Sequence, residues 1–139
     1  MRLRQLLIVT ALLVGCVING NAKGYRPAKI YMFGFAASFN DSTVYLTDIQ
    51  TVNAYLVNNR TKFLANREDY SYQLRNYLQS NGLEAYPTCI TMFAENEKDA
   101  IKKYLKLKER YEKSKKKYSI KSLKDSQFKY TPVEPDQQS

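Results

Sequence analysis

The stretch that decides the fold is IYMFGFAASF at residues 30–39, followed by the polar triplet NDS at 40–42 and by TVYLTDI at 43–49. Both apolar runs are rich in β-branched and aromatic residues, which favour strands, and the triplet is typical of a short turn. The first run is apolar on both alternating faces, as in a central strand, and Gly34 within it indicates a bulge or a close helix contact. The sequence therefore predicts a β-hairpin whose first strand lies inside a sheet.

The chain after this hairpin predicts a connection, a helix and a strand. Residues 50–65 carry a weak helical spacing interrupted by asparagines, and we expect an irregular connection there. A helix is predicted from Asn66, a suitable cap, to the stop signal at 81–82. Pro87 then opens a strand over residues 88–94.

A second helix is predicted to begin at Asn96, with acids in its first turn and lysines near its end, as the helix dipole favours. Its apolar stripe comprises Ala100, Tyr104, Leu107 and Tyr111, widened by Ile101 and Leu105. Either of the segments 119–123 and 127–131 is able to return to the sheet as a last strand. The order ββαβα plus one or two C-terminal strands predicts an α+β fold, in which two helices cover one face of a mainly antiparallel sheet.

The N-terminal segment resembles an export signal. Arg2 and Arg4 precede an apolar run at 6–18 and a small-residue stretch at 19–22, and the run is shorter than the roughly 20 residues of a spanning helix. Two cleavage sites remain open. Ordinary cleavage would remove residues 1–22, whereas a lipoprotein signal of residues 1–15 would leave Cys16 as the lipidated first residue.

The remaining chain has the size and composition of one domain. Removing 22 of 139 residues leaves 117, enough to bury a core, and the hydrophobic and charged fractions of 44% and 25% are ordinary for a globular protein. We expect a linker at 23–29, a single globular domain at 30–131 and a flexible tail at 132–139. The export signal predicts a protein that is periplasmic, anchored to an outer membrane or secreted.

Three segments carry a resemblance to a known group of proteins. Residues 31–42 with Asp48, residues 70–78, and KKYLKLK at 102–108 are similar to small exported proteins of unknown function from Bacteroidetes. The resemblance covers the chain that follows the signal. It implies export and a single domain, and it carries no activity and no catalytic residues.

The positive charge is concentrated in one region. Residues 96–129 carry thirteen Lys or Arg and five acids, a net charge of +8, whereas residues 23–95 carry seven and six, a net charge of +1. Six lysines should project away from the apolar stripe of the second helix: Lys102, Lys103, Lys106, Lys113, Lys116 and Lys117. Such a surface attracts anionic lipids, lipopolysaccharide or acidic glycans, although a solvated helix face that keeps a small protein soluble is the simpler explanation. Export makes nucleic acid an improbable partner.

Tyrosine is the second unusual feature of the composition, with twelve residues and no tryptophan. A tyrosine ring can be buried while its hydroxyl stays hydrated, so a boundary between helix and sheet accounts for many of them. The alternative is a surface for a protein or glycan partner, with Tyr70, Tyr72 and Tyr77 of the first helix as candidates.

Residues that usually carry catalysis are sparse. The chain has no histidine and no clustered glycines, which removes the commonest general base and zinc ligand and any phosphate-binding loop. Cys89 lies in an apolar strand-like run, which indicates a buried, inert thiol. We therefore predict no catalytic residues, no metal site and no cofactor.

One modification motif is present. Asp41-Ser42-Thr43 resembles the three-residue O-glycosylation site of such exported proteins, with Ser42 as the acceptor, although a hairpin turn alone explains the same residues.

These features together predict a non-catalytic binding module of the bacterial cell envelope, whose partner is an unknown protein or envelope component. The alternative is a polyanion-binding protein that acts through its basic second helix.

Overall fold

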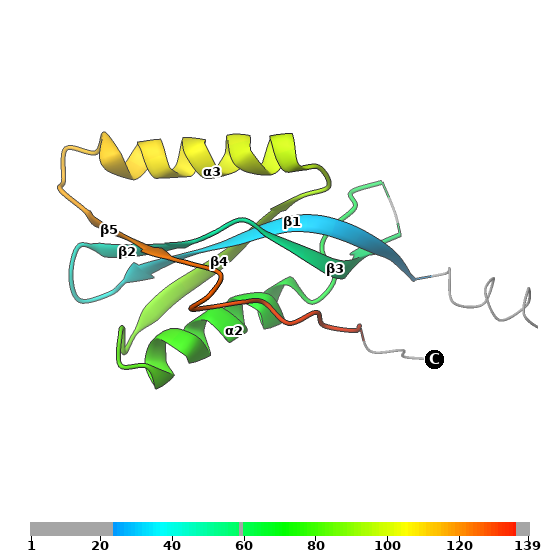
Figure 1. Cartoon of the computed structure of the whole chain (residues 1–139), viewed down its shortest axis with the longest axis horizontal. Helices are drawn as coiled ribbons and strands as arrows, with labels where there is room; N and C mark the ends of the chain where they lie inside the picture. Colours follow the sequence, from blue (N-terminus) through cyan, green and yellow to red (C-terminus); the bar gives the residue numbers. More distant parts are fainter. Residues whose placement is uncertain (1–23, 59, 136–139) are drawn as a thin grey trace, which may run out of the picture.

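The computed structural model describes residues 24–58 and 60–135. Within them, two helices and a mostly antiparallel five-stranded sheet confirm the predicted α+β class (Figure 1). In chain order, the elements are β1 (Tyr25–Ser38), β2 (Thr43–Thr47), β3 (Gln50–Val57), α2 (Arg67–Ser80), β4 (Pro87–Ala94), α3 (Glu97–Glu112) and β5 (Ser119–Leu123).

Strand β1 is the centre of the sheet, as its two apolar faces predicted. Its first half pairs with β3 and its second half with β2, while β4 runs along its other side, all three antiparallel. Strand β5 extends the sheet beyond β2 and runs parallel to it. Of the two segments able to supply a last strand, 119–123 therefore joins the sheet.

Strands β2 and β3 form one bent partner of β1 with a bulge between them. Phe35 pairs with Leu46 and Met32 with Gln50, so two residues of β1 face three residues of the bent strand. The backbone N–H of Gly34 points into this bulge and donates to Thr47 Oγ1 at 2.8 Å. The expected irregular connection at 50–65 was therefore wrong for residues 50–57, because alternate residues of this segment are buried against the sheet's core.

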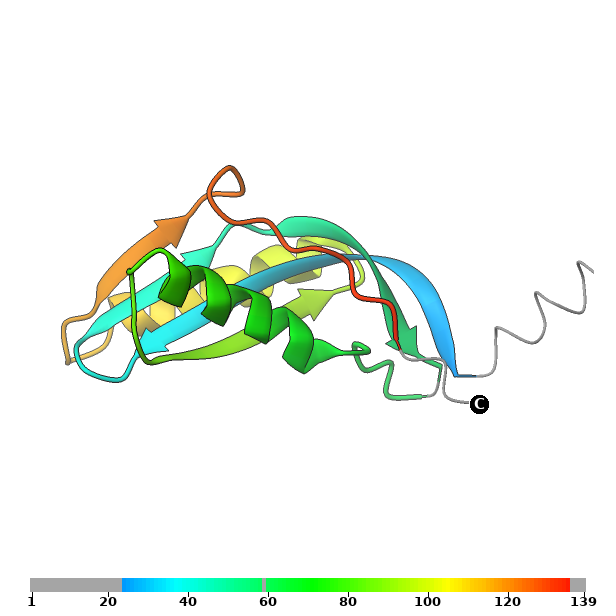
Figure 2. The same ribbon diagram turned by 90° about the horizontal axis from the view of Figure 1, so that it is seen from below.

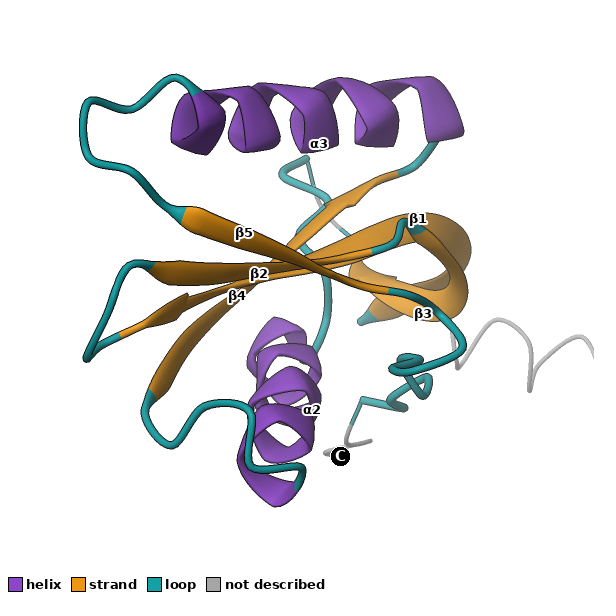
Figure 3. Cartoon of the chain, turned by 60° about the vertical axis from the view of Figure 1, so that its left-hand side comes forward, coloured by secondary structure: helices purple, strands orange, loops and turns teal. Residues whose placement is uncertain are grey.

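The helices lie on opposite faces of the sheet, so the prediction that both cover one face was wrong (Figure 3). Met32 of β1 packs into the core beneath α2, and its neighbour Phe33 packs into the core beneath α3. Because alternate residues of a strand point to opposite faces, a strand that is apolar on both needs a cover on each. The stripe of α3 is also narrower than expected, since Ile101 and Leu105 are exposed.

Both helices begin after the asparagines that the sequence indicated. Asn96 caps α3 in the usual way, since its Oδ1 accepts from the backbone N–H of Asp99 at 2.8 Å. Asn66 instead adopts a left-handed conformation and makes no side-chain cap. Its carbonyl oxygen accepts from the N–H of Asp69 at 2.9 Å.

The C-terminal segment crosses the α2 side of the sheet without joining it (Figure 2). The side-chain amide of Gln50 donates to the carbonyl of Phe128 and accepts from the N–H of Tyr130, both at 2.8 Å. Gln73 of α2 binds both backbone groups of Thr131 in the same manner. These amides take the place of a strand's backbone, and they hold Phe128 and Tyr130 in the core.

Two of the expected domain boundaries differ from the observed elements. Strand β1 starts at Tyr25, within the segment expected to be a linker at 23–29. The expected flexible tail begins with residues that are held in place, because the N–H of Val133 donates to the Tyr70 hydroxyl at 2.9 Å and its side chain packs on the core. Residues 136–139 lie outside the described part of the chain.

Gly34 is required by the close packing of Tyr130 on the sheet. A Cβ atom at position 34 would lie 2.2 Å from Tyr130 Oη and 2.8 Å from Leu74 Cδ2. The Tyr130 hydroxyl is buried and, among the described residues, has no hydrogen-bond partner. Both suggestions for Gly34, a bulge and a close helix contact, are therefore confirmed.

We predict that Gly34→Ala lowers the free energy of unfolding by about 1–3 kcal/mol, because the added methyl group overpacks this contact. Gly24→Ala is the matched control, since nothing lies within 4 Å of its added Cβ, and it should change stability by less than about 0.5 kcal/mol. Urea unfolding of both variants measures this difference, and Tyr130→Phe should restore part of the loss. Equal stabilities for the two alanine variants would contradict the prediction.

Candidate binding surfaces

The six predicted lysines divide into two groups. Three of them are held by neighbouring groups of the protein: Lys103, Lys113 and Lys116. The other three are exposed and, within the described residues, make no ion pair or hydrogen bond: Lys102, Lys106 and Lys117.

Lys103 reaches across the edge of the sheet. Its Nζ donates to the carbonyl oxygen of Phe93 in β4 at 2.8 Å and lies 5.7 Å from the centroid of the Phe93 ring. The ammonium group is therefore tied to β4 by a charge-assisted hydrogen bond and by the ring face. Lys103 therefore has a structural contact, and its role in anion binding stays a prediction.

Lys113 and Lys116 are held at the end of α3. Lys113 Nζ pairs with the carboxylate of Glu109, and this contact raises the pKa of Lys113 and lowers the pKa of Glu109. Lys116 Nζ lies 5.4 Å from the ring centroid of Tyr118. The charge of Lys113 is therefore largely neutralised by Glu109, whereas the ammonium group of Lys116 lies over an aromatic ring.

A cationic face remains along α3 and the loop after it. Its members are exposed, and within the described residues no acid pairs with any of them: Lys98, Lys102, Lys106, Arg110, Lys115 and Lys117. Two acids of this helix already form ion pairs, Glu112 with Lys108 and Glu109 with Lys113. The cationic face can therefore attract an anion without first breaking an internal ion pair.

Two of the three candidate tyrosines belong to the core. Tyr70 is fully buried, its hydroxyl accepts from the N–H of Val133, and burial raises its pKa. Tyr77 is half-buried, with its ring centroid 5.3 Å from that of Phe128. The expected partner surface on Tyr70 was wrong, because the C-terminal segment covers this side of α2.

Tyr72 lies outside this buried side of α2, and its side chain is 59% exposed. It lines an open groove of about 540 Å³ between α2 and the free edge of β4. The groove also contains Ser71, Arg75, Cys89 and Ile90. Sequence analysis did not identify Arg75 or Ile90, because it could not show that β4 is an edge strand beside α2.

Two cations block part of this edge. Strand β4 pairs with β1, and no described strand pairs with its other side. The carbonyl of Thr91 accepts from Arg67 Nε and Nη2, at 2.8 and 2.5 Å, and the carbonyl of Phe93 accepts from Lys103. Because these carbonyls point outward, their capping prevents a further strand from pairing there.

The thiol of Cys89 is a poor nucleophile in this setting. Burial raises its pKa to about 11, against an ordinary value near 9.0, and the neighbouring Arg75 lowers it only in part. The thiolate, which is the reactive form, is therefore scarce at neutral pH. The side chain packs against the core beneath α2, in keeping with the expected inert cysteine, although it is only partly buried.

The two modification candidates fall at different places. Ser42 is half-buried in the hairpin turn, where the N–H of Thr43 donates to Asp41 Oδ1 at 2.8 Å and thereby lowers the pKa of Asp41. The turn thus accounts for this motif, and glycosylation of Ser42 stays a prediction. Cys16 lies outside the described residues.

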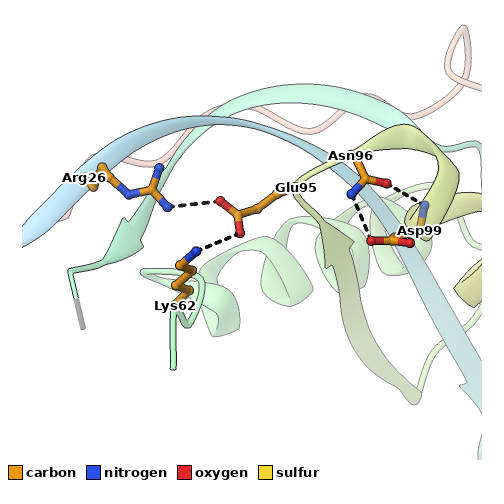
Figure 4. A network of polar contacts seen from close by, with 5 residues as sticks. All are labelled: Arg26, Lys62, Glu95, Asn96 and Asp99. Carbon is orange, nitrogen blue, oxygen red and sulfur yellow. Dashed lines mark hydrogen bonds and ion pairs between the residues drawn. The ribbon is translucent and has the colours of Figure 1, made fainter. Parts of the chain in front are cut away.

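Glu95, before α3, and Asp99, in its first turn, have structural partners (Figure 4). Glu95 pairs with Arg26 at 3.0 Å and with Lys62 at 3.9 Å, and Asp99 accepts from the side chain of Asn96 at 2.9 Å. Within the described residues, no group of three or more metal-binding side chains lies together. No described helix combines the length and the hydrophobicity needed to cross a bilayer.

Comparisons with protein-family models, with curated proteins and with solved structures found no significant match to this chain.

The capped edge leads to a prediction about self-association. Arg67→Ala with Lys103→Ala should increase association of the protein with itself, because the carbonyls of Thr91 and Phe93 become available to a second strand. Sedimentation velocity over a concentration series measures the effect. The matched control is Arg75→Ala with Lys102→Ala, which removes the same charge from the same helices without uncapping β4. Equal association of the two double variants would show that lost charge, and not the exposed edge, is responsible.

Proposed function

We propose that this protein is a non-catalytic binding module of the cell envelope, and that it engages an anionic partner through the cationic face. The observation that carries the proposal is the set of exposed, unpaired cations on α3 and the following loop. Envelope location is supported by the sequence of residues 1–22, which has the form of an export signal.

The arrangement of the charge favours an extended anionic surface, and not a small anion, as the partner. The lysines and Arg110 lie along a helix of 16 residues and a loop, and none of them lines the groove beside α2. Separate cations of this kind bind a polyanion by displacing its counterions, so the affinity falls steeply with salt. Anionic lipids, lipopolysaccharide and acidic glycans share this chemistry.

A heparin column run over a salt gradient tests the proposal. Replacing Lys102, Lys106 and Lys117 by Gln should lower the salt needed for elution, and the slope of log affinity against log salt should fall by about one unit per contacting lysine. The control replaces Lys29, Arg60 and Arg75 by Gln, which removes the same charge from exposed positions outside α3. Equal losses in both triple variants, or no retention of the original protein at low salt, would refute a localised anion-binding face.

A protein partner is the second candidate, favoured by the groove between α2 and β4. Tyr72 and Ile90, which is 42% exposed, place two large apolar side chains beside Arg75, and aromatic and arginine side chains are common anchors of protein interfaces.

If Tyr72 is such an anchor, Tyr72→Ala should weaken binding of an envelope protein by about 2 kcal/mol or more while the free energy of unfolding changes by less than about 0.5 kcal/mol. A pull-down from envelope extract, followed by titration of the captured protein, measures the first quantity, and urea unfolding measures the second. Tyr25→Ala, at another exposed tyrosine, is the control. Loss of stability without loss of capture would assign Tyr72 to the fold alone.

A further inference from the structure

Three loops meet at one end of the molecule. Strand pairing sets Ser38 opposite Pro87 and Thr43 opposite Ser119, so the turn at 39–42 lies between the loop before β4 and the loop before β5. All three loops appear at the left in both views (Figures 1 and 2). We call this region, residues 39–42, 81–86 and 113–118, the hairpin end.

The hairpin end exposes aromatic side chains. Phe39 is 83% exposed and Tyr86 is 65% exposed, and Leu83 beside them is also exposed. Phe33 and Phe35 of the preceding strand β1 are buried, whereas Phe39 lies beyond the end of that strand and outside the core. A phenylalanine in a turn, where polar residues are usual, adds apolar surface in water without stabilising the fold.

The same end carries unpaired positive charge. Lys115 and Lys117 are exposed without an acid partner among the described residues, and Lys116, also exposed, lies over the Tyr118 ring. Asp41 is the exposed acid of the turn, and its carboxylate accepts from the N–H of Thr43. Glu84 of the neighbouring loop is buried. Lys113 is paired with Glu109, and the three lysines at 115–117 outnumber the two acids of the region, Asp41 and Glu84, so the hairpin end is cationic.

We infer that the hairpin end docks on the surface of a lipid bilayer that contains anionic lipids. Phe39 and Tyr86 enter the interfacial region, where aromatic rings are stabilised, and the lysines at 115–117 contact lipid phosphates. The inference rests on the proposed function, and it names the anionic partner as a membrane. A soluble polyanion would contact the lysines but would make no apolar contact with Phe39.

The opposite end of the molecule differs in its charge. There Glu95 pairs with both Arg26 and Lys62 (Figure 4), so one acid offsets part of the positive charge, and Phe63 of the nearby loop is 58% exposed. The carbonyl oxygen of Phe63 accepts from the N–H of Val57, and Val57 pairs with Tyr25 at the start of β1. The 14 residues of β1 therefore separate Phe63 from Phe39 by about 45 Å. Phe63 is an internal control with a similar side chain and a different charge environment.

The absence of tryptophan from the sequence allows a direct test. Phe39→Trp and Phe63→Trp each introduce one fluorophore, and each purified protein is mixed with vesicles of phosphatidylcholine with or without phosphatidylglycerol. We expect a blue shift at position 39, with quenching by brominated lipid, on the anionic vesicles. Position 63 should stay unchanged.

Several results would overturn the inference. Equal shifts at both positions would indicate general adsorption, and a shift at position 63 alone would assign binding to the end where β1 begins. Equal signals on both kinds of vesicle would remove the role of lipid charge. If the Phe39→Trp variant has the same emission maximum in water and on anionic vesicles, the hairpin end does not insert.

A second set of variants separates this inference from the proposed function. Replacing the three lysines at 115–117 by Gln should weaken binding to anionic vesicles about 100-fold. Phe39→Ser should weaken vesicle binding at least tenfold while leaving heparin elution and the unfolding temperature unchanged. If the protein binds heparin but not vesicles, the membrane inference fails and the proposed function stands, whereas failure to bind either removes both.

Discussion

The two apolar faces of β1 are the constraint on which the rest of the structure depends. Ile30, Met32 and Ala36 point to one side of the strand and Phe33 and Phe35 to the other, and all five are buried. A sheet with such a central strand needs a cover on both faces, and the two helices supply one each. The position of every candidate surface follows, because α3 and α2 present their outer sides in opposite directions (Figure 3).

The C-terminal segment completes the cover on the α2 side by an uncommon means. A strand is usually held by backbone ladders, but Phe128, Tyr130 and Thr131 are held by the side-chain amides of Gln50 and Gln73. A primary amide holds an acceptor oxygen and an NH2 donor group in fixed geometry, so it can accept from a backbone N–H and donate to a backbone carbonyl as a strand would. This segment occupies the surface on which Tyr70 was expected to meet a partner.

The lysines of α3 occupy two kinds of environment that look identical in sequence. Lys103 caps the carbonyl of Phe93 on the edge strand β4, and Arg67 caps the carbonyl of Thr91 on the same strand. Lys102, the residue before Lys103, is exposed and unpaired within the described chain. One residue corresponds to a rotation of about 100° around a helix, which is enough to turn a side chain from the sheet edge toward water. The groups available for an anionic partner are those left after such structural contacts are removed.

The sequence by itself determined the class of the fold, the hairpin, both helix starts and the strand over 88–94, because these depend on local periodicity and on capping and turn residues. It also located the positive charge. Only the tertiary structure decided that the helices take opposite faces, that residues 50–57 continue the second strand beyond a bulge, and that the C-terminal segment covers Tyr70. It alone brought Phe39, Tyr86 and the lysines of 115–117 to one end. These outcomes depend on contacts between residues far apart in the chain, and local patterns do not specify which distant segment will cover a given face.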